Sequence, residues 1–281
     1  MIPAFIEAVG LCGPGLDGWR ASVAVLSGVA DHVPTPIRVP PSVLLPPNER
    51  RRAVQTVRLA LAVGSEAFAA SGRDARETAT IFASSGGDGE TIHEILSVLA
   101  SPNRELSPTR FHNSVHNAPA GYWSIATQSR APSSSLCCHD DSFTAGLLEA
   151  AVQMTAERRA VTLLAYDVQY PTPLSTVRPI GASFAVALVL APAPTAATIA
   201  GVEMKLRPKS GAASFMTAPT LEALRKSSPA TRSLPLLAAL ARRTAESVTL
   251  DYLSEMELAL DVMPVSASVL AGVERSEPVA G

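Results

Sequence analysis

The sequence predicts an α/β protein with layered helices around a mixed, mostly parallel sheet, and three observations indicate this class. Short, apolar, β-branched runs alternate with amphipathic segments of helical spacing along much of the chain. The apolar runs carry almost no charge, which is typical of strands buried on both faces. Two such runs, near 182–190 and 197–206, follow each other without a helix and indicate a mixed sheet.

The first elements are expected to be a strand, a glycine-rich turn and a short helix through RASVAVLSG. Proline-rich sequence from Pro34 to Pro47 cannot form a regular helix or a central strand, so it predicts an extended surface connection. A long amphipathic helix should follow, capped by Asn48 and ended by Gly72. Its close-packing face would consist of Ala53, Val57, Ala60, Leu61 and Gly64.

The middle of the chain repeats the alternation. TATIFASSGG predicts a strand over 78–87, and GETIHEILSVLA after it has helical spacing. A helix within FHNSVHNAPAGYWSIATQSRA should end near Arg130, followed by an extended PSSSL. DDSFTAGLLEAAVQMTAERR then predicts a long helix, and residues 160–167 predict a buried strand.

The uncharged stretch over 179–202 is long enough to raise the question of a membrane span. Pro192 and Pro194 divide it, so two buried strands fit better than one helix, and we expect no membrane span. Farther along, TLEALRKSS and PLLAALARRTAES predict helices, EMELALDV alternates like a strand, and the residues after Ala271 are expected to fray.

Composition excludes several classes of function. The formal net charge is −2 with acids and bases interspersed, which argues against a nucleic-acid partner. The three cysteines are Cys12, Cys137 and Cys138, and two adjacent cysteines are poorly placed to bridge each other. Glu7 interrupts the apolar N-terminal stretch, which lacks the features of a signal peptide. These features predict a cytoplasmic protein.

Several blocks resemble, in order, the N-terminal half of β-ketoacyl synthases in the thiolase-like superfamily. AVGLCGPGLDGW resembles the opening strand and glycine turn of that family, and ATIFASSGGDGE resembles its glycine-rich second strand. LSPTRFHNSVHNAPAGYWSIA resembles the segment before the nucleophile, and SFTAGLLEAA the helix behind it. VRPIGASFAVALVL resembles the strand that returns under the nucleophile. The likeness covers about residues 4 to 206.

Within that family, the chain is similar to the short chain-length-factor-type proteins found beside bacterial aryl polyene and pigment synthases. The resemblance implies a thiolase-like half domain over residues 1–206. Residues 207–281 would form a C-terminal extension of helices, one strand and a frayed end. A full ketosynthase has two similar halves, and this chain is expected to stop where the second would begin.

The resemblance also implies what the site can do. Ketosynthases of the family use a cysteine on a strained strand-to-helix turn, together with two histidines from the second half. The last histidine here is His139, so those two have no counterparts. Matching SFTAGLLEAA to the family helix places Leu136 at the nucleophile position, and leucine cannot attack a thioester. We therefore expect no catalytic residue and no cofactor.

An alternative stays open if the match slips by one residue. Cys137 would then stand at the turn as the nucleophile of an active acyltransferase or β-ketoacyl synthase, with His139 or His116 as its base. Against this, cysteines are commonly small buried residues. The adjacent Asp140 and Asp141 would also raise the pKa of a neighbouring thiol.

Other chemistries are disfavoured by spacing. His112 and His116 are four residues apart, but no carboxylate or third ligand accompanies them, so we expect no metal. ASSGGDGE lacks the spacing of a phosphate-binding loop, and the serines form no G-x-S-x-G elbow.

The leading hypothesis is a noncatalytic subunit that pairs with a complete β-ketoacyl-ACP synthase and limits the growth of a chain carried by acyl carrier protein. The residues expected at the tunnel wall or the interface are Phe111, Val115, Tyr122 and Trp123, although ordinary core and helix packing is the commoner role for any single one of them. A third hypothesis is a module that docks the carrier protein without contributing to the tunnel.

Overall fold

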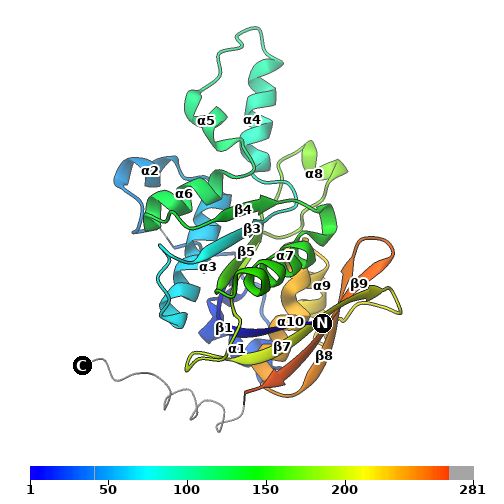
Figure 1. Cartoon of the computed structure of the whole chain (residues 1–281). Coiled ribbons are helices and arrows are strands. Elements are labelled where there is room, and N and C mark those ends of the chain that lie inside the picture. Colours follow the sequence, from blue (N-terminus) through cyan, green and yellow to red (C-terminus); the bar gives the residue numbers. More distant parts are fainter. Residues whose placement is uncertain (41, 266–281) are drawn as a thin grey trace, which may run out of the picture.

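The computed structural model describes residues 1–40 and 42–265, and a nine-stranded sheet forms the centre of this part of the chain (Figure 1). Its order is β4-β3-β5-β6-β1-β7-β9-β8, with β2 paired to β1. The strands are β1 (Ile2–Gly13), β2 (Leu16–Asp17), β3 (Ala79–Ala83), β4 (Ser133–Leu136), β5 (Val161–Asp167), β6 (Phe184–Ala191), β7 (Ala200–Pro208), β8 (Glu246–Tyr252) and β9 (Met256–Pro264).

The mixed sheet is confirmed, but its pairing is mostly antiparallel rather than mostly parallel. Parallel pairing is confined to β3 with β4 and β3 with β5. The other pairings, including β5 with β6 and both long-strand neighbours of β1, are antiparallel. The C-terminal strands account for much of the difference, because β9 pairs antiparallel both with β7 and with β8, and only β8 and β9 are joined by a short turn.

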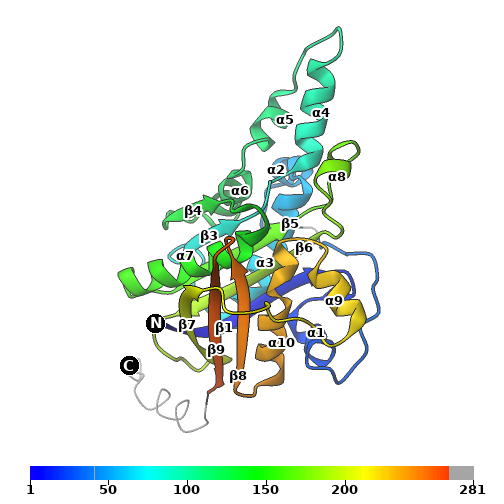
Figure 2. The same cartoon turned by 90° about the vertical axis from the view of Figure 1, so that its right-hand side faces the viewer.

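Helices cover both faces of the sheet. They are α1 (Trp19–Leu26), α2 (Pro47–Arg52), α3 (Gln55–Ser71), α4 (Gly89–Leu99), α5 (Pro108–Asn113), α6 (Ala118–Thr127), α7 (Ser142–Glu157), α8 (Leu174–Val177), α9 (Pro219–Arg225) and α10 (Leu234–Arg242), with 3-10 turns η1 (His139–Asp141) and η2 (Ala230–Ser233). Figure 2 shows α10 lying alongside β8.

Alternation along the strands divides the interior into two cores. On β5, Leu163 belongs to the larger core with α1, α7 and α10, whereas Leu164 belongs to the smaller core with α3 and α6. Successive strand residues face opposite sides, so one uncharged strand supplies both cores. The predicted strands near 182–190 and 197–206 are confirmed as β6 and β7. None of the described helices is both long and apolar enough to cross a membrane.

The long helix predicted after Asn48 is two helices. The backbone at Ala53 is extended (ψ 116°), which ends α2 and separates it from α3. Pro46 rather than Asn48 is the N-cap, and the Asn48 side chain instead accepts a hydrogen bond from Arg51. Gly72 ends α3 as predicted, with a left-handed backbone (φ 71°) that glycine adopts without strain.

Two other boundaries differ from prediction. The helix expected to end near Arg130 is divided into α5 and α6 and ends at Thr127. The helix through PLLAALARRTAES ends at Arg242, because the residues from Glu246 onward join the sheet as β8. Strand pairing with β9 therefore overrides the local helical spacing.

The predicted boundary at residue 206 does not coincide with a structural break. It falls inside β7, which pairs with β9 along its whole length. Leu236, Leu237 and Leu240 of α10 belong to the same core as the first strand. The residues after 207 therefore complete the central sheet and its larger core. The predicted fraying after Ala271 lies outside the described residues.

Helix α3 lies unusually close to the sheet because glycines stand at its contacts. A Cβ on Gly10 of β1 would lie 1.9 Å from the carbonyl oxygen of Val63, and one on Gly64 would lie 2.5 Å from Cζ3 of Trp123. Real side chains do not approach this closely. Gly10 therefore allows α3 to approach β1 closely, and Gly64 allows α6 to approach α3 closely.

Gly64→Ala should destabilise the fold by roughly 2 kcal/mol, because the added methyl group forces Trp123 and Leu164 apart in a tightly packed core. Urea denaturation measures the change. Gly121→Ala is the matched control, since Gly121 also lies in a helix but has open space at its Cβ position. The control should be neutral or up to about 1 kcal/mol more stable. Equal effects at both positions would contradict the close-approach explanation.

Candidate functional site

The parallel strands β3, β4 and β5 end side by side, and the turns that follow them bring the predicted site residues together. The register pairs Ala83 of β3 with Leu136 of β4 on one side and with Ala165 of β5 on the other. The turns that follow these strands therefore meet. They carry the serines after β3, the two cysteines after β4 and Asp167 at the end of β5.

Two backbone carbonyls hold the candidate nucleophile and base. The Cys137 thiol donates a hydrogen bond to the carbonyl of Ser85 (3.2 Å), and Nε2 of His116 lies 3.0 Å from the carbonyl oxygen of Ser84. His116 comes from the connection between α5 and α6. Among the described residues no hydrogen bond joins a histidine ring to Cys137. The alternative site is thus gathered in one place without the thiol–imidazole contact that activates a cysteine.

The sharp part of the strand-to-helix turn lies after Leu136. Leu136 is the last residue of β4, still pairs with Ala83, and packs against the larger core. The left-handed backbone of this turn falls at His139 (φ 49°), within η1. A non-glycine residue in that conformation is strained. The strained backbone of this turn is therefore at the exposed His139, and Leu136 lies before it in the strand because it still pairs with β3. The placement of Leu136 at the nucleophile position stays a prediction.

The two carboxylates after His139 form an ion-pair network. Asp140 pairs with Arg178 (2.6 Å) and Arg232 (3.2 Å), and Asp141 pairs with Arg232 (2.9 Å). Asp141 also accepts the backbone N–H of Leu253, between β8 and β9. Burial raises the pKa of Asp140, but the Arg178 hydrogen bond and the charges of Arg232 and Arg178 outweigh it, so the pKa lies below its ordinary value. Three separate segments thus hold the turn.

The electrostatics disfavour a thiolate at the second cysteine. Burial raises the pKa of Cys138, and the negative charge of Asp141 raises it further. The Cys138 backbone N–H donates to the Ser142 hydroxyl (2.9 Å), which in turn donates to the carbonyl of His139 (2.7 Å). These contacts order the start of α7 around the cysteines.

Asp167 is a central residue that the sequence analysis missed. It is buried, and its carboxylate accepts hydrogen bonds from the Ser85 N–H (2.8 Å), the Ser85 hydroxyl (2.7 Å) and the Ala230 N–H (2.8 Å). Burial raises its pKa, while these donors and the charge of Arg178 act in the opposite direction. A lone acid at the end of the apolar run AVTLLAYD is the signal that marks it.

The four residues expected at a tunnel wall or interface fall into two pairs. Phe111 and Val115 are 63% and 49% exposed, in and just after α5. Tyr122 and Trp123 are 1% and 2% exposed and belong to the smaller core. Surface contact with a partner is therefore open to the first pair only. Trp123 packs against Phe68, with ring centroids 5.3 Å apart.

The pair of histidines at 112 and 116 does not form a shared site. α5 ends at Asn113, so the two are not on one helix face. The His112 ring lies edge-on to Tyr122, with centroids 6.1 Å apart, while His116 contacts the Ser84 carbonyl. Within residues 1–40 and 42–265, no group of three or more histidine, cysteine or acidic side chains is placed to hold a metal ion.

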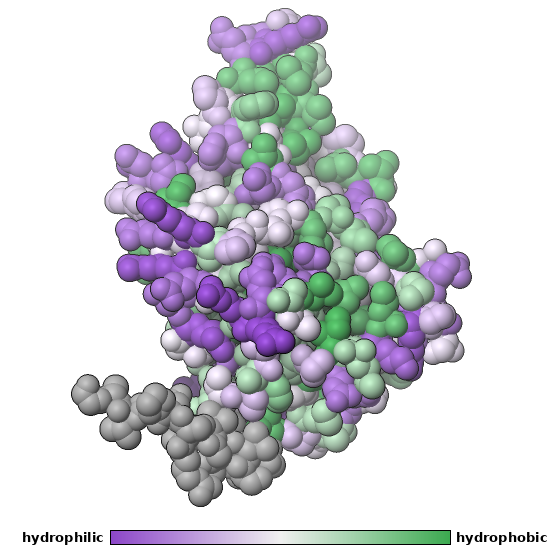
Figure 3. Space-filling view, viewed as in Figure 1, coloured by the Kyte–Doolittle hydropathy of each residue, from purple (hydrophilic) through white to green (hydrophobic). Residues whose placement is uncertain are grey.

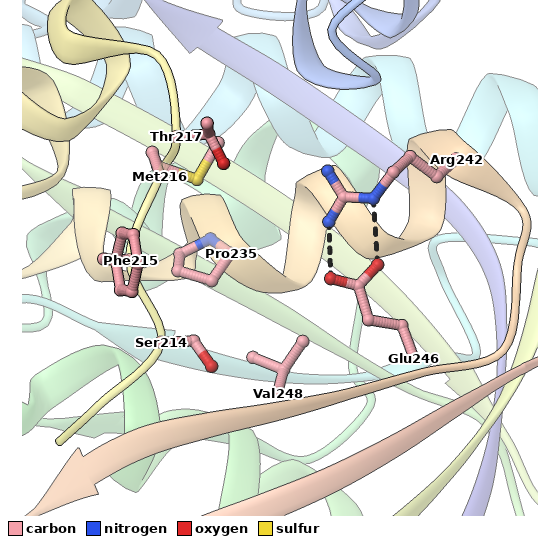
Figure 4. Close-up of a pocket in the computed structure, with 8 residues that line it drawn as sticks. All are labelled: Ser214, Phe215, Met216, Thr217, Pro235, Arg242, Glu246 and Val248. Atoms are coloured by element: carbon pink, nitrogen blue, oxygen red, sulfur yellow. Dashed lines mark hydrogen bonds and ion pairs between the residues drawn. The ribbon is translucent and has the colours of Figure 1, made fainter.

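A separate surface pocket of about 420 Å³ lies between α10, β8 and the segment before α9 (Figure 4). Phe215, Pro235 and Val248 contribute its apolar side, and Arg242 and Glu246 face each other in a bidentate ion pair. Because these two charges already satisfy each other, the lining residues that the structure describes present no free charge to a ligand. It is also remote in the sheet order from β4.

Asp140→Asn should remove a stabilising contribution that depends on pH. A carboxyl group whose pKa is lowered by folding stabilises the protein above its ordinary value of 3.8, and this contribution is lost as the pH falls through the lower folded value. The stability difference from wild type should be below about 1 kcal/mol at pH 6, because the pair is partly exposed, and smaller at pH 3. Urea denaturation at both pH values measures it, with Asp31→Asn as an exposed control. A difference that grows at pH 3 would contradict the assignment.

Solved structures with a similar fold include three that contain a ketosynthase. A chain of the complex "Ketosynthase (ApeO) in Complex with its Chain Length Factor (ApeC) from Xenorhabdus doucetiae" superposes with a TM-score of 0.69 at 23% identity, covering 93% of this chain and 100% of that one. The ishigamide ketosynthase/chain length factor gives 0.70 at 12% identity, covering 95% and 100%. An acyl-carrier protein complex, AntDE:AntF, gives 0.71 at 10% identity, covering 94% and 99%. At these identities the likeness establishes the fold.

Sequence comparison identifies the family. No curated protein sequence matches the chain significantly. The family described as "Beta-ketoacyl synthase, N-terminal domain" matches residues 26–251, a range that continues past residue 206 and ends within β8. Because this match covers most of the 281 residues, the chain belongs to the β-ketoacyl synthase N-terminal domain family.

Proposed function

We propose that the chain is a noncatalytic, chain-length-factor-type subunit that pairs with a complete β-ketoacyl-ACP synthase. In this role it shapes the acyl tunnel in fatty-acid or polyketide-type synthesis of the aryl polyene kind, with the growing chain delivered by acyl carrier protein. The observation that carries the proposal is a projecting apolar arm, formed by α4 and α5, that has no core of its own. The three free cysteines fit the cytoplasm, where thiols stay reduced.

The arm stands away from the rest of the fold (Figure 1). The only buried residues of its two helices are Gly89 and Thr91 in α4 and Asn113 in α5, so neither helix buries an apolar side chain. Short helices are marginal in water unless an apolar face is packed. The arm therefore needs a partner surface to bury its apolar residues.

The apolar side chains of the arm are concentrated on its surface. Leu96, Leu99, Phe111 and Val115 are all exposed. Figure 3 shows hydrophobic surface over this arm below a hydrophilic tip. Contiguous exposed apolar surface of this kind marks interaction sites, and permanent partners bury the most apolar interfaces. The partner that we propose for this surface is a second chain of the ketosynthase type.

The edge of the sheet formed by β4 offers a second contact. β4 is the terminal strand, and its outer side has no strand neighbour among the described residues. Ser133 and Ser134 on it are exposed. An open edge strand is a ready template for pairing with another chain. The arm and this edge together would form one continuous interface leading to the turn at Cys137.

The active-enzyme alternative receives less support from the site. His116 and His139, its two proposed bases, contact a backbone carbonyl and Asp140 respectively. The carboxylates at the turn are paired with arginines, an arrangement that fixes the turn without activating a thiol. The similar solved structures are ketosynthases with chain length factors or with an acyl-carrier protein, which supports the same role here.

Phe111→Glu should prevent assembly with the ketosynthase partner, because it places a charge in a desolvated apolar interface. Co-purification with candidate ketosynthases from the same source, followed by native mass measurement, tests this. Val177→Glu is the matched control, since Val177 is at least as exposed but lies on α8, outside the arm. A wild-type chain that remains alone with every such partner would refute the proposal, as would a complex that both variants form equally.

Cys137→Ala should leave the turnover of the assembled complex within about twofold of wild type, because the proposed subunit contributes no nucleophile. Phe111→Ala, which retains the apolar character of the arm, should lengthen the product if this side chain limits the tunnel. Chain lengths read by mass spectrometry, with an electrophilic acyl analogue to map any adduct, separate the hypotheses. Stoichiometric labelling of Cys137 with loss of turnover in Cys137→Ala would establish the enzyme alternative. Unchanged product length in Phe111→Ala would favour a docking module.

A further inference from the structure

A surface that is both basic and apolar lies where the proline-rich connection enters α2. Val43 and Leu44 are adjacent in this connection and are 78% and 45% exposed. Helix α2 follows directly, has no buried residue and carries the consecutive arginines 50–52. Figure 3 shows hydrophilic surface over α2. Exposed aliphatic side chains therefore stand beside a helix whose cations all face solvent.

Contacts place arginines around the aliphatic side chains. The Arg50 guanidinium donates hydrogen bonds to the carbonyls of Val43 (3.4 Å) and Leu45 (2.9 Å). Arg58 is exposed on α3, one helical turn before Ala62, which lines a groove together with Val43. Leu45 is buried in the smaller core and holds the connection against α3. The resulting surface, called the α2 patch, consists of Val43, Leu44, Arg50, Arg51 and Arg58.

Neighbouring acids leave the positive charge of the α2 patch uncompensated. Glu49 is paired with Arg52 (3.6 Å), which is not part of the patch. Asp17 and Glu66 line an adjoining groove together with Arg38. Within residues 1–40 and 42–265, the arginines of the patch form hydrogen bonds with uncharged groups and no ion pairs. The patch thus concentrates cations on a chain whose formal net charge is −2.

A lipid bilayer supplies partners for both kinds of side chain in this patch. Guanidinium groups bind phosphate oxygens well, and aliphatic side chains gain free energy when they enter the acyl-chain boundary. Clustered basic residues near a bilayer select anionic headgroups. We propose that the α2 patch attaches the protein peripherally to an anionic lipid bilayer. Lipid phosphates contact its arginines, and its two aliphatic side chains insert at the boundary of the acyl chains.

Attachment of this kind is weak and reversible and needs no membrane-spanning helix, because few side chains enter the lipid. It also goes beyond the proposed subunit function. The α2 patch contains no residue of the arm or of β4, which form the proposed interface with a ketosynthase. Lipid binding can therefore be measured on the full chain without a partner.

Co-sedimentation with vesicles tests the proposal. The full chain should sediment with vesicles of equal parts phosphatidylglycerol and phosphatidylcholine in about 50 mM NaCl, and not with vesicles of phosphatidylcholine alone. The affinity should fall at least tenfold in about 500 mM NaCl, because salt screens the charges. Dissolved glycerol 3-phosphate in millimolar excess carries the headgroup charge without a bilayer and should not release the chain.

Single substitutions locate the binding surface. Arg51→Gln and Arg58→Gln should each weaken binding to the mixed vesicles about fivefold. Arg243→Gln is the matched control, because Arg243 is exposed at the end of α10, which packs in the larger core. Val43→Ser should weaken binding about three- to tenfold. Val29→Ser, at a more exposed valine after α1, should have no effect. Circular dichroism checks that each variant is folded.

The proposal is overturned if the chain sediments with neither kind of vesicle, or equally with both. Patch variants that bind as tightly as their controls would also overturn it, as would release by glycerol 3-phosphate, which would indicate a site for a soluble anion. Retention on immobilised poly-L-glutamate without vesicle binding would point instead to an acidic protein partner. None of these results depends on a ketosynthase, so each leaves the proposed subunit function to its own test.

Discussion

The buried carboxylate of Asp167 is the contact on which the arrangement of the site depends. It accepts hydrogen bonds from Ser85 after β3 and from Ala230 in η2, two segments far apart in the chain. An unpaired charge at this depth would cost several kcal/mol, so the donors must remain where they are. Ser85 in turn presents the carbonyl that accepts the Cys137 thiol. The position of the cysteine is thus fixed through a residue that belongs to another strand.

The same contact explains why the C-terminal third cannot be separated from the site. η2 supplies both Ala230, bonded to Asp167, and Arg232, paired with Asp140 and Asp141. Asp141 also holds the backbone of Leu253 between β8 and β9. The segment after residue 207 therefore contributes a hydrogen-bond donor, a cation and an edge of the sheet to one turn. Its removal would expose the larger core and release the turn after β4 together.

The sequence predicted most elements because the strands and helices with strong apolar patterning do not depend on distant partners. β3, β5, β6 and α7 lie within a few residues of their expected ranges. β8 was missed because the helical spacing of PLLAALARRTAES continues past Arg242, and only pairing with β9 makes Glu246 onward a strand. The strained backbone at His139 was not anticipated for a related reason. Strand length is set by β3, which the local sequence does not encode.

The site residues also divide into those that the local sequence identifies and those that depend on long-range contacts. Cys137, His116 and the acids after His139 were identifiable by type and were predicted to meet, whereas Asp167, Arg178 and Arg232 acquire their roles only through long-range contacts. Those contacts determine the charge around the cysteines of the turn. An activated cysteine needs nearby positive charge to lower the pKa of its thiol. Here Arg178 and Arg232 are paired with Asp140 and Asp141, and burial, with the negative charge of Asp141 adding to it, raises the pKa of Cys138. In the described part of the chain, the charges of this turn are therefore paired with one another instead of stabilising a thiolate.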